Sequence, residues 1–145
     1  MTKRQITRML TLAKNISYMS DRPDFKLSCI IFDTHKVWAI GFNNNKTSVL
    51  QRRFNKFNPH YNHNWHHSIH AEISAIAHLF SKYKFKKLPF DKLSVLVYRE
   101  HANGTYAMAK PCPACEDALR HYGFKNIYYT GNCSFVHEVY KKLKK

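Results

Sequence analysis

The sequence contains few acidic residues and no long hydrophobic segment. No apolar run approaches the roughly 20 residues that a membrane-spanning helix requires, and no apolar signal region follows the first five residues, Met1-Thr2-Lys3-Arg4-Gln5. No low-complexity linker, break in composition or internal repeat divides the 145 residues. We therefore expect a single soluble domain spanning residues 1–145, cytoplasmic and without a membrane partner.

The scarcity of acidic residues leaves a large positive charge. Asp and Glu number 9 against 24 Lys and Arg, which gives a formal net charge of +15. A field of this size attracts phosphate groups. It is compatible with a mononucleotide, with a polynucleotide and with a simple effect on solubility, so the charge alone does not identify a partner.

Hydrophobic spacing predicts alternating helices and strands. The expected elements are a helix through residues 6–16 with a capping box at Thr2 and Gln5, strands at 27–32 and 37–42, a helix over 69–80, a strand at 93–98, a helix from Pro113 to Gly123, a strand at 126–130 and a closing helix through 135–143. A helix between strands 93–98 and 126–130 implies a parallel crossover. The fold predicted is α/β, a three-layer α/β/α sandwich with a mixed sheet. Residues 105–109, which follow a hairpin signal at Asn103-Gly104, could add a short fifth strand.

Two short motifs supply potential metal ligands. The first is His70-Ala71-Glu72, and the second is Pro111-Cys112-Pro113-Ala114-Cys115. One imidazole and two thiolates make three protein ligands, and a zinc ion held by three ligands keeps its fourth tetrahedral position open for water. The carboxylate of Glu72 is then free to act on that water. This inventory predicts a hydrolytic zinc site.

Both motifs are predicted to lie where a helix begins. Ser68 is a suitable N-cap for the first helix, and Pro113 suits the first position of the second, which Gly123 would end. At the amino end of a helix the dipole favours thiolate over thiol, so Cys112 and Cys115 can serve as anionic ligands at neutral pH.

Other interpretations of the cysteines remain open. A lone C-x-x-C can be a redox pair, and a structural zinc site would result if Cys29 or Cys133 closed the fourth position. Neither interpretation gives Glu72 a function. Cys29 falls within an apolar strand pattern and is predicted to lie in the core, so the cysteines fit the reducing cytosol better than a disulfide framework.

The motif order H-x-E followed by P-C-x-x-C is the signature of the zinc base deaminases. With it, the chain resembles the cytidine and deoxycytidylate deaminase superfamily over nearly its whole length. The resemblance implies a cytidine-deaminase-like fold and one zinc per chain, held by His70, Cys112 and Cys115. It assigns Glu72 the proton transfers that replace the ring amino group by oxygen and release ammonia. It also implies a homo-oligomer.

Substrate contacts are implied by the same resemblance. Gly41-Phe42-Asn43 is similar to the family's G-aromatic-N segment, which assigns Asn43 a contact with the base or sugar, and Ala71 is expected to touch the substrate as well. Two departures from the family bear on the substrate. Lys110 stands where relatives commonly have an acidic residue, and residues 101–109 are an addition.

The leading hypothesis is a deaminase of a free cytosine nucleotide, similar to deoxycytidylate deaminases, with Arg52, Arg53 and Arg99 as candidates for binding the phosphate. A first alternative is deamination of cytosine or adenine in RNA or single-stranded DNA, because His70-Ala71-Glu72-Ile73 also resembles the transfer RNA adenosine deaminases. Cations and aromatics interleave between Arg52 and His67, as on a single-strand binding surface.

A second alternative is a non-catalytic, zinc-stabilised module that binds nucleic acid. The segment between His60 and His67 contains four histidines, and some deoxycytidylate deaminases bind a further structural zinc. Most such histidines are polar loop residues, so the sequence does not favour a second metal site there.

Overall fold

The computed structural model describes residues 2–22, 25–59, 68–84 and 86–141. The histidine-rich segment considered above as a second metal site therefore lies outside the described residues. The elements in chain order are α1 (Lys3–Ser17), β1 (Leu27–Phe32), β2 (Val37–Phe42), α2 (Val49–Asn55), α3 (Ala71–Lys82), the short 3-10 helix η1 (Phe90–Lys92), β3 (Ser94–Arg99), α4 (Pro113–Tyr122), β4 (Asn126–Gly131) and β5 (Ser134–Val139).

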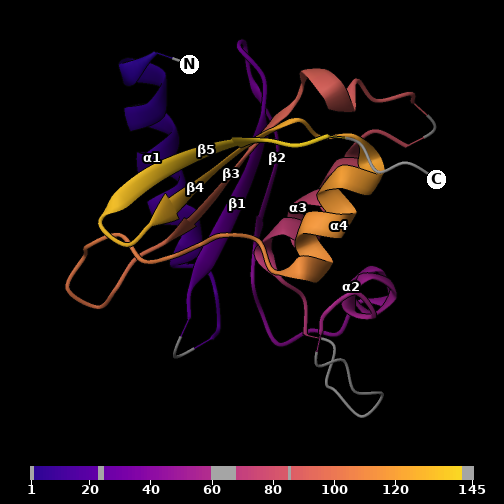
Figure 1. Ribbon diagram of the computed structural model, residues 1–145, viewed down its shortest axis with the longest axis horizontal. Coiled ribbons are helices and arrows are strands. Elements are labelled where there is room, and N and C mark those ends of the chain that lie inside the picture. The colour runs from indigo at the N-terminus through magenta and orange to yellow at the C-terminus, as the bar shows by residue number, and fades with distance from the viewer. Residues whose placement is uncertain (1, 23–24, 60–67, 85, 142–145) are drawn as a thin grey trace.

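A five-stranded sheet in the order β2-β1-β3-β4-β5 forms the middle layer. Strand β1 is antiparallel to β2 and β3, β3 and β4 are parallel, and β5 returns antiparallel to β4. Helix α1 packs on one face of the sheet, and α3 and α4 lie on the other (Figure 1). The predicted α/β sandwich with a mixed sheet is confirmed, as is the parallel crossover through α4. No helix in the described part of the chain is both long and apolar enough to cross a membrane.

The capping residues of α1 and α4 are found where the sequence predicts them. The Thr2 hydroxyl accepts from the Gln5 amide at 3.2 Å, and the Gln5 side chain accepts from the Thr2 amide at 3.0 Å, which completes the capping box. Helix α4 starts at Pro113 and ends at Gly123, whose φ of +98° is the left-handed conformation that glycine adopts without strain. Helix α3 begins later than predicted, because its N-cap is His70 and not Ser68.

The predicted closing helix through 135–143 is wrong, because residues 134–139 form strand β5. Gly131 pairs with Ser134, so only Asn132 and Cys133 form the turn that brings the chain back along β4. The apolar residues in this segment, among them Phe135 and Val136, are of types that suit strands as well as helices, and pairing with β4 decides the outcome. The fifth strand is therefore β5, whereas residues 105–109 contribute a single bridge, between Glu100 and Tyr106.

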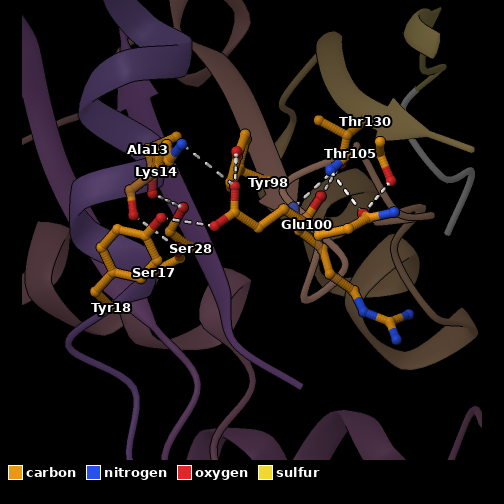
Figure 2. A network of polar contacts seen from close by, with 11 residues as sticks. Ala13, Lys14, Ser17, Tyr18, Ser28, Tyr98, Glu100, Thr105 and Thr130 are labelled. Carbon is orange, nitrogen blue, oxygen red and sulfur yellow. Dashed lines mark hydrogen bonds and ion pairs between the residues drawn. The ribbon is translucent and has the colours of Figure 1, made fainter. Parts of the chain in front are cut away.

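The segment between β3 and the cysteine motif is attached to the sheet at both ends, and Figure 2 shows the contacts of Glu100 at its start. At its start, the hydroxyls of Tyr18 and Tyr98 each donate to the Glu100 carboxylate at 2.7 Å, which joins the end of α1 to β3. At its end, the Thr130 hydroxyl donates to the Ala107 carbonyl at 2.8 Å. These contacts hold residues 101–109 against the sheet, so the position at which the chain enters the cysteine motif at Pro111 is fixed.

Gly41 in β2 lies directly under α3. A Cβ atom on Gly41 would be 2.6 Å from the carbonyl oxygen of Ala71 and would also collide with the backbone nitrogen of Ala75. The missing side chain therefore allows the first turn of α3 to rest on the strand. This close approach determines how far the start of α3 stands above the sheet.

Candidate active site

The imidazole and the two thiols of the sequence motifs meet on the α3 and α4 side of the sheet. His70 is the N-cap of α3, Cys112 is the N-cap of α4, and Cys115 lies in the first turn of α4. The Nδ1 atom of His70 is 3.4 Å from the sulfur of Cys115 and 3.6 Å from that of Cys112. The ligand atoms of all three residues lie within 4.8 Å of one another. Two helix starts therefore face a common point.

This donor set fits a zinc ion. Zinc binds thiolate and imidazole ligands more readily than harder cations do. Three such ligands leave one tetrahedral position of the zinc ion open. Within the described ranges, these three residues form the one group of three or more His, Cys, Asp or Glu side chains close enough to share an ion. Neither Cys29 nor Cys133 belongs to it. The group fits one zinc per chain and offers no fourth protein ligand of these types.

The pKa values of the two cysteine thiols are shifted in opposite directions. A hydrogen bond from Cys115, together with the nearby His70, outweighs burial and lowers the pKa of Cys112 to about 4. The hydrogen bond to Cys112 and complete burial raise the pKa of Cys115. For His70, burial disfavours the charged ring, but the hydrogen bond to Cys112 and the charge of Glu72 outweigh it, so its pKa is raised. A cation would bind the deprotonated forms of these three side chains and would therefore displace their protons.

Glu72 lies in the first turn of α3, two residues beyond the His70 ligand. It is only 4% exposed, and burial raises the pKa of its carboxyl group because the charged form loses its contact with water. A buried carboxylic acid with a raised pKa beside a cavity is a frequent property of catalytic acids and bases. Burial and its position beside the His70 ligand make Glu72 the candidate for proton transfer, a role that stays a prediction.

A cavity of about 280 Å³ opens beside these groups. Its lining includes Glu72, His70 and Cys112, and both residues predicted to contact the substrate, Asn43 and Ala71. The Asn43 side chain accepts from the Leu27 amide at 2.9 Å and donates to the Phe25 carbonyl at 2.7 Å. An amide group has two N–H donors, and among the described residues one N–H of Asn43 has no protein acceptor. The substrate contacts of Asn43 and Ala71 stay predictions.

The arginines predicted to bind phosphate lie elsewhere. Arg52 and Arg53 are exposed on α2, and Arg99 stacks on the Phe25 ring at 4.4 Å. None of the three is among the described residues that line the cavity. Their role in binding phosphate stays a prediction that the cavity does not support.

Two other cations, Arg22 and Lys110, do line the cavity. The Arg22 guanidinium donates to the side chain of Asn45 at 3.0 Å, and the Lys110 ammonium lies 4.0 Å from the Glu138 carboxylate. Lys110 could have been found from its position beside Pro111. Arg22 follows α1 in a connecting segment, and no local pattern marks it.

Comparisons with known proteins agree with this geometry. The family model described as the cytidine and deoxycytidylate deaminase zinc-binding region matches residues 2–131. No curated protein matches the sequence.

Among solved structures, the dCMP deaminase of the cyanophage S-TIM5 in apo form is similar at 21% identity and a TM-score of 0.59, covering 89% of this chain and 84% of that one. The cytidine deaminase of Burkholderia pseudomallei has 19% identity and a TM-score of 0.59, covering 96% and 93%. At these identities the structures establish a shared fold. Because the family model spans most of the sequence, the chain belongs to the cytidine and deoxycytidylate deaminase family.

Proposed function

We propose that this protein hydrolyses the amino group of the cytosine ring in a free nucleotide, giving uracil and ammonia. Membership of the family supports a hydrolytic deaminase of the cytidine or deoxycytidylate type. The proposal adds that the substrate carries a phosphate. The observation behind this addition is that Arg22 and Lys110 line the same cavity as Glu72.

The residues divide the reaction between them. A zinc ion held by His70, Cys112 and Cys115 would make a water molecule acidic enough to lose a proton at neutral pH. Glu72 accepts that proton and delivers it to the ring nitrogen next to the carbon that the water oxygen attacks. Glu72 then carries a second proton from the attacking oxygen to the amino group, the carbon–nitrogen bond breaks, and ammonia leaves. One buried carboxylate thus serves as base and then as acid.

Two cations at the cavity support a phosphorylated substrate. Among the described residues, Arg22 has a neutral amide partner and Lys110 has one carboxylate at 4.0 Å, so neither cation forms a close ion pair there. Charge-assisted hydrogen bonds to phosphate oxygens are stronger than neutral ones. A similar structure, the dCMP deaminase of cyanophage S-TIM5, was solved in complex with dCMP and dUMP. These observations favour a mononucleotide over a bare nucleoside.

A second candidate is deamination within a single-stranded polynucleotide. One observation favours it: the Phe25 ring lines the cavity, is 47% exposed, and carries the Arg99 guanidinium at 4.4 Å. An exposed ring with a stacked cation is suited to hold a neighbouring base. A non-catalytic zinc module is less well supported, because it leaves the buried Glu72 without a function.

Ammonia release from cytidine, deoxycytidine, their monophosphates and single-stranded oligonucleotides tests the proposal. We expect turnover of a monophosphate with a higher kcat/KM than that of its nucleoside. Removing a charged hydrogen-bond partner costs about 1.5–3 kcal/mol, so Arg22→Ala and Lys110→Ala should each lower kcat/KM for the monophosphate at least about tenfold. The nucleoside should be much less affected.

Arg8→Ala, an exposed arginine on α1, provides the control for a change in net charge. Arg52→Ala, Arg53→Ala and Arg99→Ala in the same assay test the arginines predicted from the sequence. Turnover of an oligonucleotide together with none of deoxycytidylate at saturating concentration would overturn the proposal. Binding of the oligonucleotide should then weaken steeply with salt, since each phosphate contact releases condensed counterions.

A further inference from the structure

The two helices that carry the zinc ligands begin without a cap of their own. In both, the first N–H groups lack partners inside the helix, and neither the His70 nor the Cys112 side chain, each at an N-cap, caps its own helix in the described structure. Two of the N–H groups near these helix starts are instead bonded by amide side chains from a third segment. That segment is α2 with the three residues that follow Asn55.

Gln51 of α2 bonds to the start of α3. Its side-chain oxygen accepts from the backbone N–H of His70 at 2.9 Å, and its side-chain nitrogen donates to the Asn55 oxygen at 2.7 Å. Gln51 is completely buried, and Asn55 nearly so. Because both ends of the Gln51 amide are engaged, its orientation is fixed, and with it the distance from α2 to the backbone of His70.

Asn58 bonds to the start of α4. Its side-chain oxygen accepts from the backbone N–H of Ala114 at 3.1 Å. Ala114 is fully buried and stands between the two cysteine ligands. The Asn58 backbone in turn donates to the Asn55 carbonyl at 3.0 Å, so Asn58 is tied to the end of α2.

Helix α2 is itself anchored against α4. The Phe54 ring is 2% exposed and meets the rings of His121 and Tyr122 edge-on, with centroids 5.8 and 6.0 Å away. The Ser48 hydroxyl caps the first turn of α2 by accepting from the backbone N–H of Gln51 at 3.2 Å. Figure 1 shows α2 beside the ends of α3 and α4 at which these two helices begin.

We infer that Gln51 and Asn58 are positioning residues, which set the spacing between the two helix starts and therefore between the His70 imidazole and the two cysteine thiolates. One short segment bonds to the backbone of a ligand on α3 and to the backbone between two ligands on α4. Outer contacts that orient metal ligands typically change metal affinity or activity about 10- to 100-fold when they are removed. The inference rests on the zinc site of the proposed function and is independent of the substrate.

Asn58→Leu and Gln51→Leu test the inference, because they remove the acceptors while keeping side chains of similar size. Asn58→Asp keeps the acceptor oxygen. Ser28→Ala is the matched control, since Ser28 is also fully buried and bonds to the Ala13 carbonyl, at 2.6 Å, on the opposite face of the sheet. The readouts are the rate of zinc release to a chelator, the visible absorption spectrum of the cobalt-substituted protein, and thermal unfolding.

Both leucine variants should release zinc about 10- to 100-fold faster and shift the cobalt bands, whereas Asn58→Asp should retain the native spectrum. Ser28→Ala should lower Tm without changing either metal readout. Asn58 is only half-buried, so Asn58→Leu decides the outcome if Gln51→Leu does not fold.

Native spectra and native zinc release in Asn58→Leu would overturn the inference, as would equally fast release from Ser28→Ala. If the native protein binds neither zinc nor cobalt, both the zinc site and this inference are wrong. If the metal readouts are as expected but the protein does not deaminate its substrates, only the proposed function is contradicted.

Discussion

The four α-helices of the described residues begin in two different ways. Helices α1 and α2 begin with Thr2 and Ser48, whose hydroxyls each accept a backbone N–H of their own first turn at 3.2 Å. Helices α3 and α4 begin with His70 and Cys112, whose side chains lie 3.6 Å from each other and make no cap in the described structure. The first pair of helices uses its N-cap position for stability, and the second pair uses it for ligands.

The difference shows where the chain gives up local stability for a site. Ser, Thr, Asp and Asn are the favoured N-cap residues, and replacing one by a residue that cannot cap costs about 0.5–2 kcal/mol. A histidine and a cysteine at two N-caps, with a carboxylate and a second thiol in the turns that follow, break the local preference twice on the same side of the sheet. Conflicts of this kind are expected at functional sites.

Restoring an ordinary cap to α3 or α4 should have the largest effect. His70→Ser and Cys112→Ser each supply a hydroxyl that can cap the helix and remove a zinc ligand. We expect zinc to fall well below one per chain by metal analysis and deamination to be lost. The unfolding free energy of each variant should equal that of the native protein stripped of zinc or be higher by up to about 1 kcal/mol, because the new hydroxyl caps the helix. Full zinc content in either variant would refute the ligand assignment.

Glu72→Gln should rank second. The amide keeps the shape of the side chain in the first turn of α3 and cannot shuttle a proton. Loss of general acid–base catalysis lowers kcat by about 10²- to 10⁴-fold. Zinc content and the cobalt spectrum should match those of the native protein, which separates this variant from the ligand variants. Substantial residual turnover would mean that another group moves the proton.

Gly41→Ala should rank third, and its main effect should be a loss of folding stability. The added methyl group meets the backbone of α3, with the Ala71 oxygen at 2.6 Å, so either the strand or the helix has to move. Overpacking of this kind costs about 1–3 kcal/mol, measurable by urea unfolding. Gly104→Ala supplies a comparison, because that glycine has open space around it although its φ of +86° is strained for alanine. Equal stability of Gly41→Ala and the native protein would contradict the close packing.

Thr2→Ala should have the smallest effect. It removes the cap of α1, on the face of the sheet opposite the site, and should lower the unfolding free energy by about 1 kcal/mol. The rate of zinc release and kcat should not change. A change in either would show that the ordinary caps and the ligand-bearing starts are coupled.

The sequence predicts best what depends on neighbours along the chain. The strands at 27–32 and 37–42, the capping box at Thr2 and the C-terminal glycine of α4 are local patterns, and the structure confirms them. The cysteine motif likewise contains its own helix-start signal in Pro113. At the His70 motif the predicted cap, Ser68, is wrong, and α3 begins two residues later.

What the sequence does not predict depends on distant partners. The apolar residues of 135–139 suit a helix or a strand, and pairing with β4 decides between them. Helix α2 buries Gln51 and Asn55 along with Phe54, so a search for apolar spacing does not detect it. Arg22 reaches the cavity from the connection after α1, whereas the more conspicuous Arg52 and Arg53 are exposed on α2 and do not line it.

The close approach at Gly41 also bears on motion. With the backbone of α3 resting on β2 and no side chain between them, the helix cannot slide along the sheet without colliding with the strand. The start of α3, with Glu72 and the first ligand, is therefore held at a fixed height above the sheet. On the function proposed above, movement that admits the substrate is expected of residues outside the helices and strands, such as Arg22 and Phe25, while Glu72 keeps its place.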